Sequence, residues 1–120
     1  MSGLRSERLI VEDMIGAAQR LVELGAECAP EPLGLDQTLG EGVLFNIIIL
    51  GEAAKRASIE TRASFPLVPW RELARTRDRL VHHYEGVDWE VVQQIIDVDL
   101  PRIIPLLHTV RDTFSDGAAP

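Results

Sequence analysis

Residues 43–57 have the sequence VLFNIIILGEAAKRA, and this stretch decides between a helical and a β-sheet fold. Its first half is apolar on nearly every side, and its three consecutive isoleucines would also suit a buried strand. The second half continues with strong helix formers and contains no turn signal. The stretch therefore predicts the centre of one buried helix, which we expect to begin near Asp36 or Thr38 and to end near Ser64, before the next prolines.

Three further segments have the periodicity of amphipathic helices, and they span about residues 6–27, 70–86 and 88–115. Joints that contain proline or glycine separate the segments. In the last segment we expect Pro101 and Pro105 to kink or to split the helix, because proline lacks the backbone N–H and its ring collides with the preceding turn. Four helices with short joints predict an all-α, antiparallel up-down four-helix bundle, formed by one domain of residues 1–120.

The composition limits the class of protein. With 46% hydrophobic and 26% charged residues, a chain of 120 residues can bury one core. Its single cysteine, Cys28, cannot form an intrachain disulfide, which suits a reducing compartment. We find neither a secretory signal nor an apolar run that could span a bilayer, so we expect a cytoplasmic protein. The formal net charge of −7 argues against broad nucleic-acid binding, so an RNA-binding function requires a local basic patch or a partner.

The third helical segment places a charge where an apolar side chain is expected. Spacings of four, three, one and three residues place Arg77 on the apolar stripe of this helix, together with Leu73, Leu80, Val81 and Tyr84. A guanidinium there is costly unless it is ion-paired or faces a cleft or a second subunit. Tyr84 can present its hydroxyl to the same space. The spacing leaves two interpretations open, a structural ion pair with Glu52 and a functional site.

Histidines and further arginines follow the same helix. His82 comes five residues after Arg77, well over a quarter turn around an ideal helix. It joins the same site only if the helix unwinds near Gly86 or if a second subunit supplies another copy, and His83 points elsewhere. The segment has a net positive charge, as a phosphate-binding surface requires, and its candidate RNA-binding residues are Arg71, Arg75 and Arg79.

Asn46 is a polar residue within the apolar second segment. It shares a helix face with Leu50 and Ala53. We interpret it as a core amide whose hydrogen bonds are satisfied and which holds the helix in register, and we assign it a supporting role.

The segment from Trp70 onward also fits a known pattern. Residues 77–84, RDRLVHHY, contain an arginine, four residues, a histidine, one residue and a tyrosine. Together with LGEAAKR at 50–56 and DLP at 99–101, they resemble the HepT-like ribonucleases of the HEPN superfamily, the toxin halves of bacterial toxin–antitoxin pairs. The short motif alone is common, but its combination with the flanking segments is specific. The resemblance covers about residues 46–105.

The resemblance implies an all-helical, metal-independent endoribonuclease that needs no cofactor and acts as a homodimer, with the motifs of two subunits lining one cleft. It assigns catalysis to Arg77 and His82. It matches Tyr84 to the tyrosine that a cognate minimal nucleotidyltransferase antitoxin modifies with AMP, which silences the toxin. Asp78 matches the acidic residue of the motif, and His83 stands where a small or polar residue is expected. We count both as supporting residues.

The residue types suit this reaction. RNA carries its own nucleophile, the 2′-hydroxyl, so no metal is required to generate one. Histidine can take up a proton near neutral pH, and arginine can stabilise the charge that builds up on the phosphorane.

Two other functions remain open at this point. One is a non-catalytic subunit that binds a nucleotide or substrate for a minimal nucleotidyltransferase, and the acidic net charge favours it. The other is a purely structural interaction domain.

Overall fold

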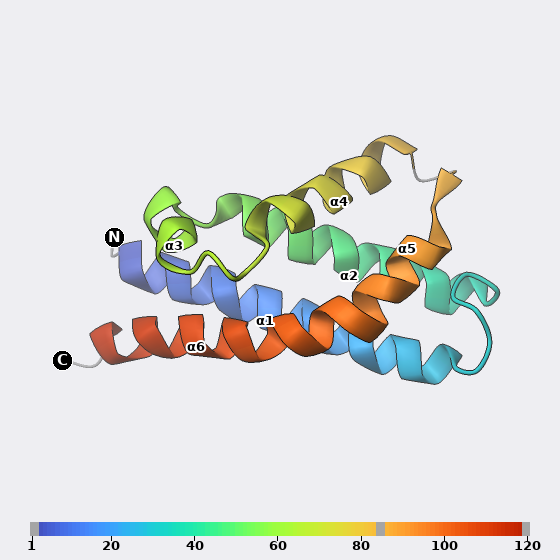
Figure 1. The fold of residues 1–120 in the computed structure, drawn as a ribbon, viewed down its shortest axis with the longest axis horizontal. Helices are drawn as coiled ribbons and strands as arrows, with labels where there is room; N and C mark the ends of the chain where they lie inside the picture. Colours follow the sequence, from blue (N-terminus) through green and yellow to red (C-terminus); the bar gives the residue numbers. More distant parts are fainter. Residues whose placement is uncertain (1–2, 84–85, 119–120) are drawn as a thin grey trace.

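The chain folds into helices joined by short connections (Figure 1). A computed structural model describes residues 3–83 and 86–118, with side chains for residues 7–82 and 86–114. Every regular element within these ranges is helical, which confirms the all-α prediction. The elements are α1 (Gly3–Cys28), α2 (Gln37–Arg56), α3 (Ile59–Ser64), α4 (Trp70–His83), α5 (Trp89–Gln94), a π-helical turn (Ile95–Asp99) and α6 (Leu100–Ala118).

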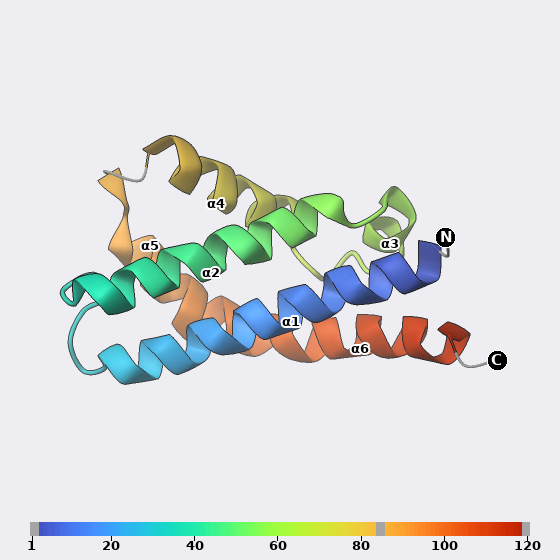
Figure 2. The same ribbon diagram turned by 180° about the vertical axis from the view of Figure 1, so that it is seen from behind.

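The four long helices lie side by side and alternate in direction (Figures 1 and 2). α1 packs against both α2 and α6, whereas α4 packs mainly against α2. The described part of the chain measures 48 × 26 × 23 Å along its principal axes. The predicted up-down arrangement is confirmed, and α4 is the long helix with a single principal neighbour.

The apolar faces of α1, α2 and α6 meet in one core. The largest fully buried side chains all belong to these three helices, and they are Val11, Met14, Leu21, Val43, Leu50, Leu100, Ile103, Leu107 and Val110. Leu73 and Leu80 join this core from α4, whereas Val81 of the same predicted stripe is 43% exposed, so the described part of the stripe is buried only in part. Within residues 3–83 and 86–118, none of the helices combines the length and apolar character that crossing a membrane requires.

The second predicted helix is two helices, and the prediction that it continues to Ser64 is wrong. α2 ends at Arg56 because Ala57 adopts an extended backbone, with φ −61° and ψ 139°. Ser58 then begins α3 by accepting a hydrogen bond from the backbone N–H of Thr61. A serine that can serve as an N-cap therefore interrupts a run of helix-forming residues without any proline or glycine.

The predicted fourth helix begins as expected but is not uniform. The Asp88 carboxylate caps α5 by accepting hydrogen bonds from two N–H groups of its first turn. The following turn is π-helical, and the N–H of Leu100 donates to the carbonyl of Ile95, five residues back. Pro101 lies in the first turn of α6, where its missing N–H is tolerated, and Pro105 lies inside α6. Figure 1 shows the chain changing direction between α5 and α6, so the expected kink lies mainly before Pro101.

Glu7 connects the start of α1 to the start of α3. Its Oε1 accepts hydrogen bonds from the backbone N–H of Ser58 at 2.8 Å and from the Thr61 hydroxyl at 2.7 Å. Burial raises the pKa of Glu7, but the hydrogen bonds from Thr61 and Ser58 and the charge of Arg62 outweigh it and hold the pKa below its usual value. The ionised carboxylate therefore stabilises this junction.

We expect Glu7→Ala to lower the free energy of unfolding by about 1.5–3 kcal/mol at neutral pH, the range for hydrogen bonds to a charged group. This stabilisation is present above the pKa of the unfolded state and is lost as the pH falls through the lower pKa of the folded state. Urea denaturation at neutral pH and in acid measures both effects. Glu7→Gln is the matched control, since it keeps an acceptor oxygen and should lose less. A loss that is the same at both pH values would contradict the role of the charge.

Candidate active site

Arg77 lies at the contact between α4 and α2. Its neighbours on the apolar stripe, Leu73 and Leu80, are both buried. The Arg77 side chain remains 24% exposed, so its aliphatic stem packs inward while its guanidinium reaches the surface. The sequence pattern placed this arginine correctly.

Gly51 makes the close approach of these two helices possible. A methyl group at this position would overlap the Cβ of Arg77 and would lie 2.6 Å from the carbonyl oxygen of Leu73. Only a residue without a Cβ lets the Arg77 stem lie flat against α2. The only sequence signal for this role is a glycine inside a strongly helical run, which does not by itself predict a close contact.

The Arg77 guanidinium contacts two carboxylates. Its Nε lies 2.9 Å from Oε2 of Glu52, and its Nη1 donates a hydrogen bond to Oδ1 of Asp78 at 3.0 Å. The Glu52 and Arg77 atoms are both shielded from solvent, and they form an ion pair without the alignment of a hydrogen bond. The same Asp78 oxygen accepts a hydrogen bond from Lys55 Nζ at 3.1 Å. The predicted ion pair with Glu52 is thus present.

These contacts keep Asp78 ionised and leave N–H donors of Arg77 available for a further ligand. Hydrogen bonds from Arg77 and then from Lys55 hold the pKa of Asp78 below its usual value, so this carboxylate is ionised at neutral pH. The two carboxylates meet the guanidinium at Nε and Nη1. Because a guanidinium carries five N–H donors, Arg77 can keep these carboxylates and also donate to a phosphate.

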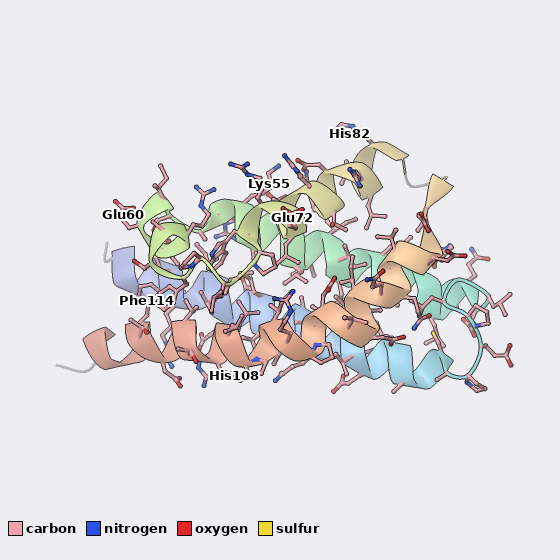
Figure 3. The ribbon with its side chains drawn as sticks, viewed as in Figure 1. Lys55, Glu60, Glu72, His82, His108 and Phe114 are labelled. Carbon is pink, nitrogen blue, oxygen red and sulfur yellow. The ribbon has the colours of Figure 1, made fainter. Side chains whose placement is uncertain are left out.

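His82 lies on a different side of α4 from Arg77. The helix continues without interruption to His83, so a separation of five residues turns the two side chains about 140° apart. The His82 side chain is exposed, and Figure 3 shows it at the outer edge of the molecule near the end of α4. The helix does not unwind before His83, so one chain alone does not bring Arg77 and His82 to one face. Tyr84 and the side chain of His83 lie outside the described residues.

The remaining predicted residues fall into two groups. Arg71, Arg75 and Arg79 are exposed on α4, as an RNA-binding role requires. Asn46 donates a hydrogen bond from Nδ2 to the carbonyl oxygen of Gly42 at 2.8 Å, one turn earlier in α2. Asn46 is only partly buried, so it is not the core residue that the sequence predicts, and its supporting role stays a prediction.

Two parts of this surface were absent from the sequence analysis. Lys55 is linked to Arg77 through Asp78, which contacts both side chains. Arg62 of α3 lines the same hollow as the start of α4. Neither lies in the motif, and both become neighbours of α4 only through the pairing of helices. Among the residues whose side chains are described, no group of three or more His, Cys, Asp or Glu side chains is arranged to hold a metal ion.

Comparisons with known proteins agree on one family. The family model described as ribonuclease HepT-like matches residues 13–110. A protein from Thermococcus cleftensis named "Probable ribonuclease HepT" is 33% identical over 82% of this chain and 90% of its own length. A candidate RNase from Methanocaldococcus jannaschii is 26% identical over 86% of this chain and 85% of its own length. No solved structure matches the chain significantly. The sequence resemblance is confirmed, and the chain belongs to the family of HepT-like ribonucleases.

Proposed function

We propose that this protein is a metal-independent endoribonuclease and the toxin of a toxin–antitoxin pair. The observation that carries the proposal is the partly exposed side chain of Arg77, held against α2 on the same helix that presents His82. Membership in a ribonuclease family supports RNA as the substrate.

The proposed reaction uses the 2′-hydroxyl of RNA as the nucleophile. His82 takes the proton of this hydroxyl while the bond between the 2′-oxygen and phosphorus forms and the bond from phosphorus to the 5′-oxygen breaks. The leaving 5′-oxygen takes up a proton from water, and His82 later releases its proton to the solvent. Arg77 stabilises the negative charge on the phosphorane, because its N–H donors match phosphate oxygens. The products are a 2′,3′-cyclic phosphate and a 5′-hydroxyl.

We propose that a homodimer completes the catalytic cleft. Arg77 and His82 point to different sides of one uninterrupted helix, so a two-fold symmetric pair of chains is the simplest way to combine them. Apolar side chains near the Arg77 ion pairs support an interface, since Phe45 of α2 is 62% exposed and Val81 of α4 is 43% exposed.

We also propose that a minimal nucleotidyltransferase acts as the antitoxin by attaching AMP to Tyr84. Tyr84 follows His82 by two residues in the chain. An added nucleotide would place bulk and negative charge next to the site where the substrate phosphate binds, which would inhibit cleavage sterically and electrostatically.

A second function is favoured by one specific observation. Glu52 and Asp78 balance much of the Arg77 charge in a protein with a net charge of −7. A subunit that binds a nucleotide or substrate for a nucleotidyltransferase, without cutting RNA, would suit such a neutralised arginine.

One experiment separates these functions. The protein is produced with and without a cognate minimal nucleotidyltransferase, and the intact mass of each sample is measured beside an RNA cleavage assay that contains a chelator. We expect cleavage only by the unmodified sample, with 2′,3′-cyclic phosphate ends, and a mass gain in AMP units at Tyr84 in the other. Nucleotide binding without cleavage by either sample would favour the second function. Cleavage abolished by the chelator would contradict the metal-independent mechanism.

A further inference from the structure

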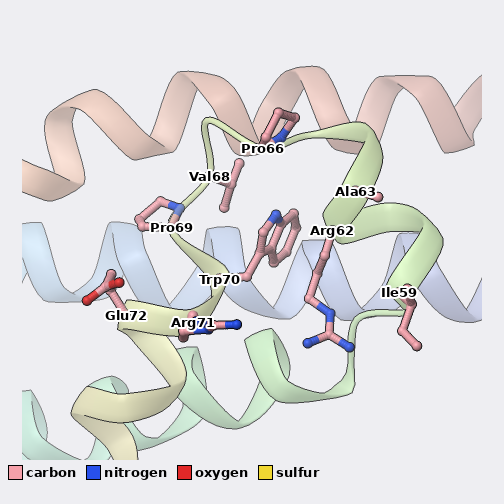
Figure 4. A pocket seen from close by; sticks show the side chains of 9 residues that line it. All are labelled: Ile59, Arg62, Ala63, Pro66, Val68, Pro69, Trp70, Arg71 and Glu72. Atoms are coloured by element: carbon pink, nitrogen blue, oxygen red, sulfur yellow. The ribbon is translucent and has the colours of Figure 1, made fainter.

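A hollow lies at the start of α4, at the opposite end of this helix from His82. It has a volume of about 530 Å³ and lies between α3, the connection after it and the first turn of α4. Figure 4 shows that Val68 and Trp70 line it from within, that Ile59 and Pro66 border it, and that Arg62 and Arg71 approach it from α3 and α4. This volume is within the range of small-ligand sites.

The two arginines at the hollow differ from Arg77 in their partners. Figure 4 shows the guanidinium ends of Arg62 and Arg71 extending toward each other, whereas the carboxylate of Glu72 points away from them. Among the described side chains, neither arginine forms an ion pair, although Arg62 Nε donates a hydrogen bond to the carbonyl of Ser58 at 3.4 Å. The charge of Arg62 acts on Glu7, but no ion pair joins the two side chains. Two exposed cations beside a hollow that is lined partly by apolar side chains suit a ligand that combines a phosphate with an apolar part.

Across the described residues, the arginines that form an ion pair and those that form none lie in different parts of the chain. The arginines of α1 and α6 whose side chains are described each form an ion pair with a carboxylate within four residues in the chain, and they are Arg8, Arg20, Arg102 and Arg111. The arginines without an ion pair among the described residues all lie between the end of α2 and the middle of α4, and they are Arg56, Arg62, Arg71, Arg75 and Arg79. Residues 55–79 hold seven Lys and Arg against three Asp and Glu. Within the described residues, the arginines without an ion pair are therefore concentrated in one segment of an acidic chain.

A continuous face of α4 connects the hollow to His82. Arg71, Arg75 and His82 share one side of the helix, at spacings of four and seven residues, and all three are exposed. From residue 71 to residue 82 the helix rises about 16 Å. Substrate bound at His82 can therefore continue along this face toward the hollow.

On this basis we infer that the hollow between Arg62 and Arg71 binds a nucleotide of single-stranded RNA some distance along the strand from the cleaved bond. The inference rests on the proposed function. The two guanidiniums bind the phosphate, and the nucleoside lies against Ile59, Pro66 and Val68. A single strand is required because a base must leave its stack to reach an apolar surface.

The test compares RNA binding and cleavage by Arg62→Gln, Arg71→Gln and the wild-type protein. Binding of a single-stranded RNA of about 12 nucleotides, within the usual size of such sites, is followed by fluorescence anisotropy at several salt concentrations. A 2′-O-methyl group at every sugar prevents cleavage of this probe. We expect each variant to bind several-fold more weakly and to show a slope of log K against log salt that is less negative by about 0.7, the value for one lost phosphate contact. Arg62→Lys keeps the charge and should keep the slope.

Matched controls separate this inference from the proposed function. Arg20→Gln removes an ion-paired arginine of α1 and should leave RNA binding unchanged. Arg62→Gln should cleave a dinucleotide as fast as the wild type, because that substrate cannot reach the hollow. Wild-type affinity and salt slope in Arg62→Gln, or an equal loss on the dinucleotide, would overturn the inference and leave the proposed function standing. A wild-type protein that neither binds nor cleaves RNA would overturn both.

Discussion

A His82→Ala variant is expected to cleave RNA roughly 10²- to 10⁴-fold more slowly than the wild-type protein, the range that a positioned general base contributes. The expectation follows from the exposed position of His82 near the end of α4 and from the absence of a nucleophile other than the RNA 2′-hydroxyl in the proposed reaction. Single-turnover cleavage of an end-labelled RNA measures the chemical step. Equal melting temperatures of the two proteins would show that the fold is intact.

His83 provides a matched control for this result. It is the same residue type, it follows His82 directly in the chain, and the proposed reaction gives it no proton to transfer. His83→Ala should therefore lose far less activity than His82→Ala. Equal losses in the two variants, or wild-type cleavage by His82→Ala, would remove His82 from the mechanism.

The His82→Ala variant also tests whether the cleft is shared between the two chains of the proposed dimer. Arg77→Ala and His82→Ala should each be nearly inactive alone, since each lacks one member of the cleft. Mixed dimers supply an intact Arg77 from one chain and an intact His82 from the other, so mixing the two proteins should restore part of the activity. A mixture that stays as inactive as its components would argue against a cleft shared between subunits.

The second large effect is expected at Gly51. Gly51→Ala would place a methyl group against the Arg77 Cβ and within 2.6 Å of the Leu73 carbonyl, so α4 must move away from α2. Overpacking of this kind costs about 1–3 kcal/mol, and we expect the melting temperature to fall by several degrees. RNA cleavage should fall as well, because the shift separates Arg77 from Glu52.

A second glycine in a helix provides the control. Gly16 lies in α1, and a methyl group there would meet no heavy atom within 4 Å. Gly16→Ala should therefore stabilise the protein by up to about 1 kcal/mol, because alanine favours the helix. Thermal unfolding of both variants tests the contrast. A Gly51→Ala protein as stable as the wild type would mean that α4 is free to shift on α2.

Local patterns in the sequence predicted the helices well, because they depend on neighbours along the chain. The carboxylate caps at Asp36 and Asp88 and the apolar stripe through Leu73 and Leu80 follow from short-range chemistry. The break at Ser58 was missed because the residues on either side of it favour helix and no breaker marks the turn. The π-helical turn before Pro101 was likewise invisible, since only the effect of the proline ring could be anticipated.

The sequence predicted the part of the site that depends on one helix, but not the part that depends on how the helices pack. The ion pair of Arg77 with Glu52 could be anticipated from the cost of a charge on an apolar stripe. The shape of the contact depends on Gly51, and the basic surface includes Arg62 of α3, whose nearness to Arg71 follows from tertiary packing. Whether Arg77 and His82 act together depends on a second chain, which periodicity within one helix does not specify.

The position of α4 at the margin of the bundle has a consequence for local unfolding. The helix that carries the proposed catalytic residues has one principal neighbour, α2, whereas α1 lies between two long helices. Elements with few packing partners open at a lower free energy than the core of the same protein. Backbone amides of α4 should therefore exchange with deuterium sooner than those of α1. Any partner that covers the outer face of α4 should slow that exchange most at the residues it touches.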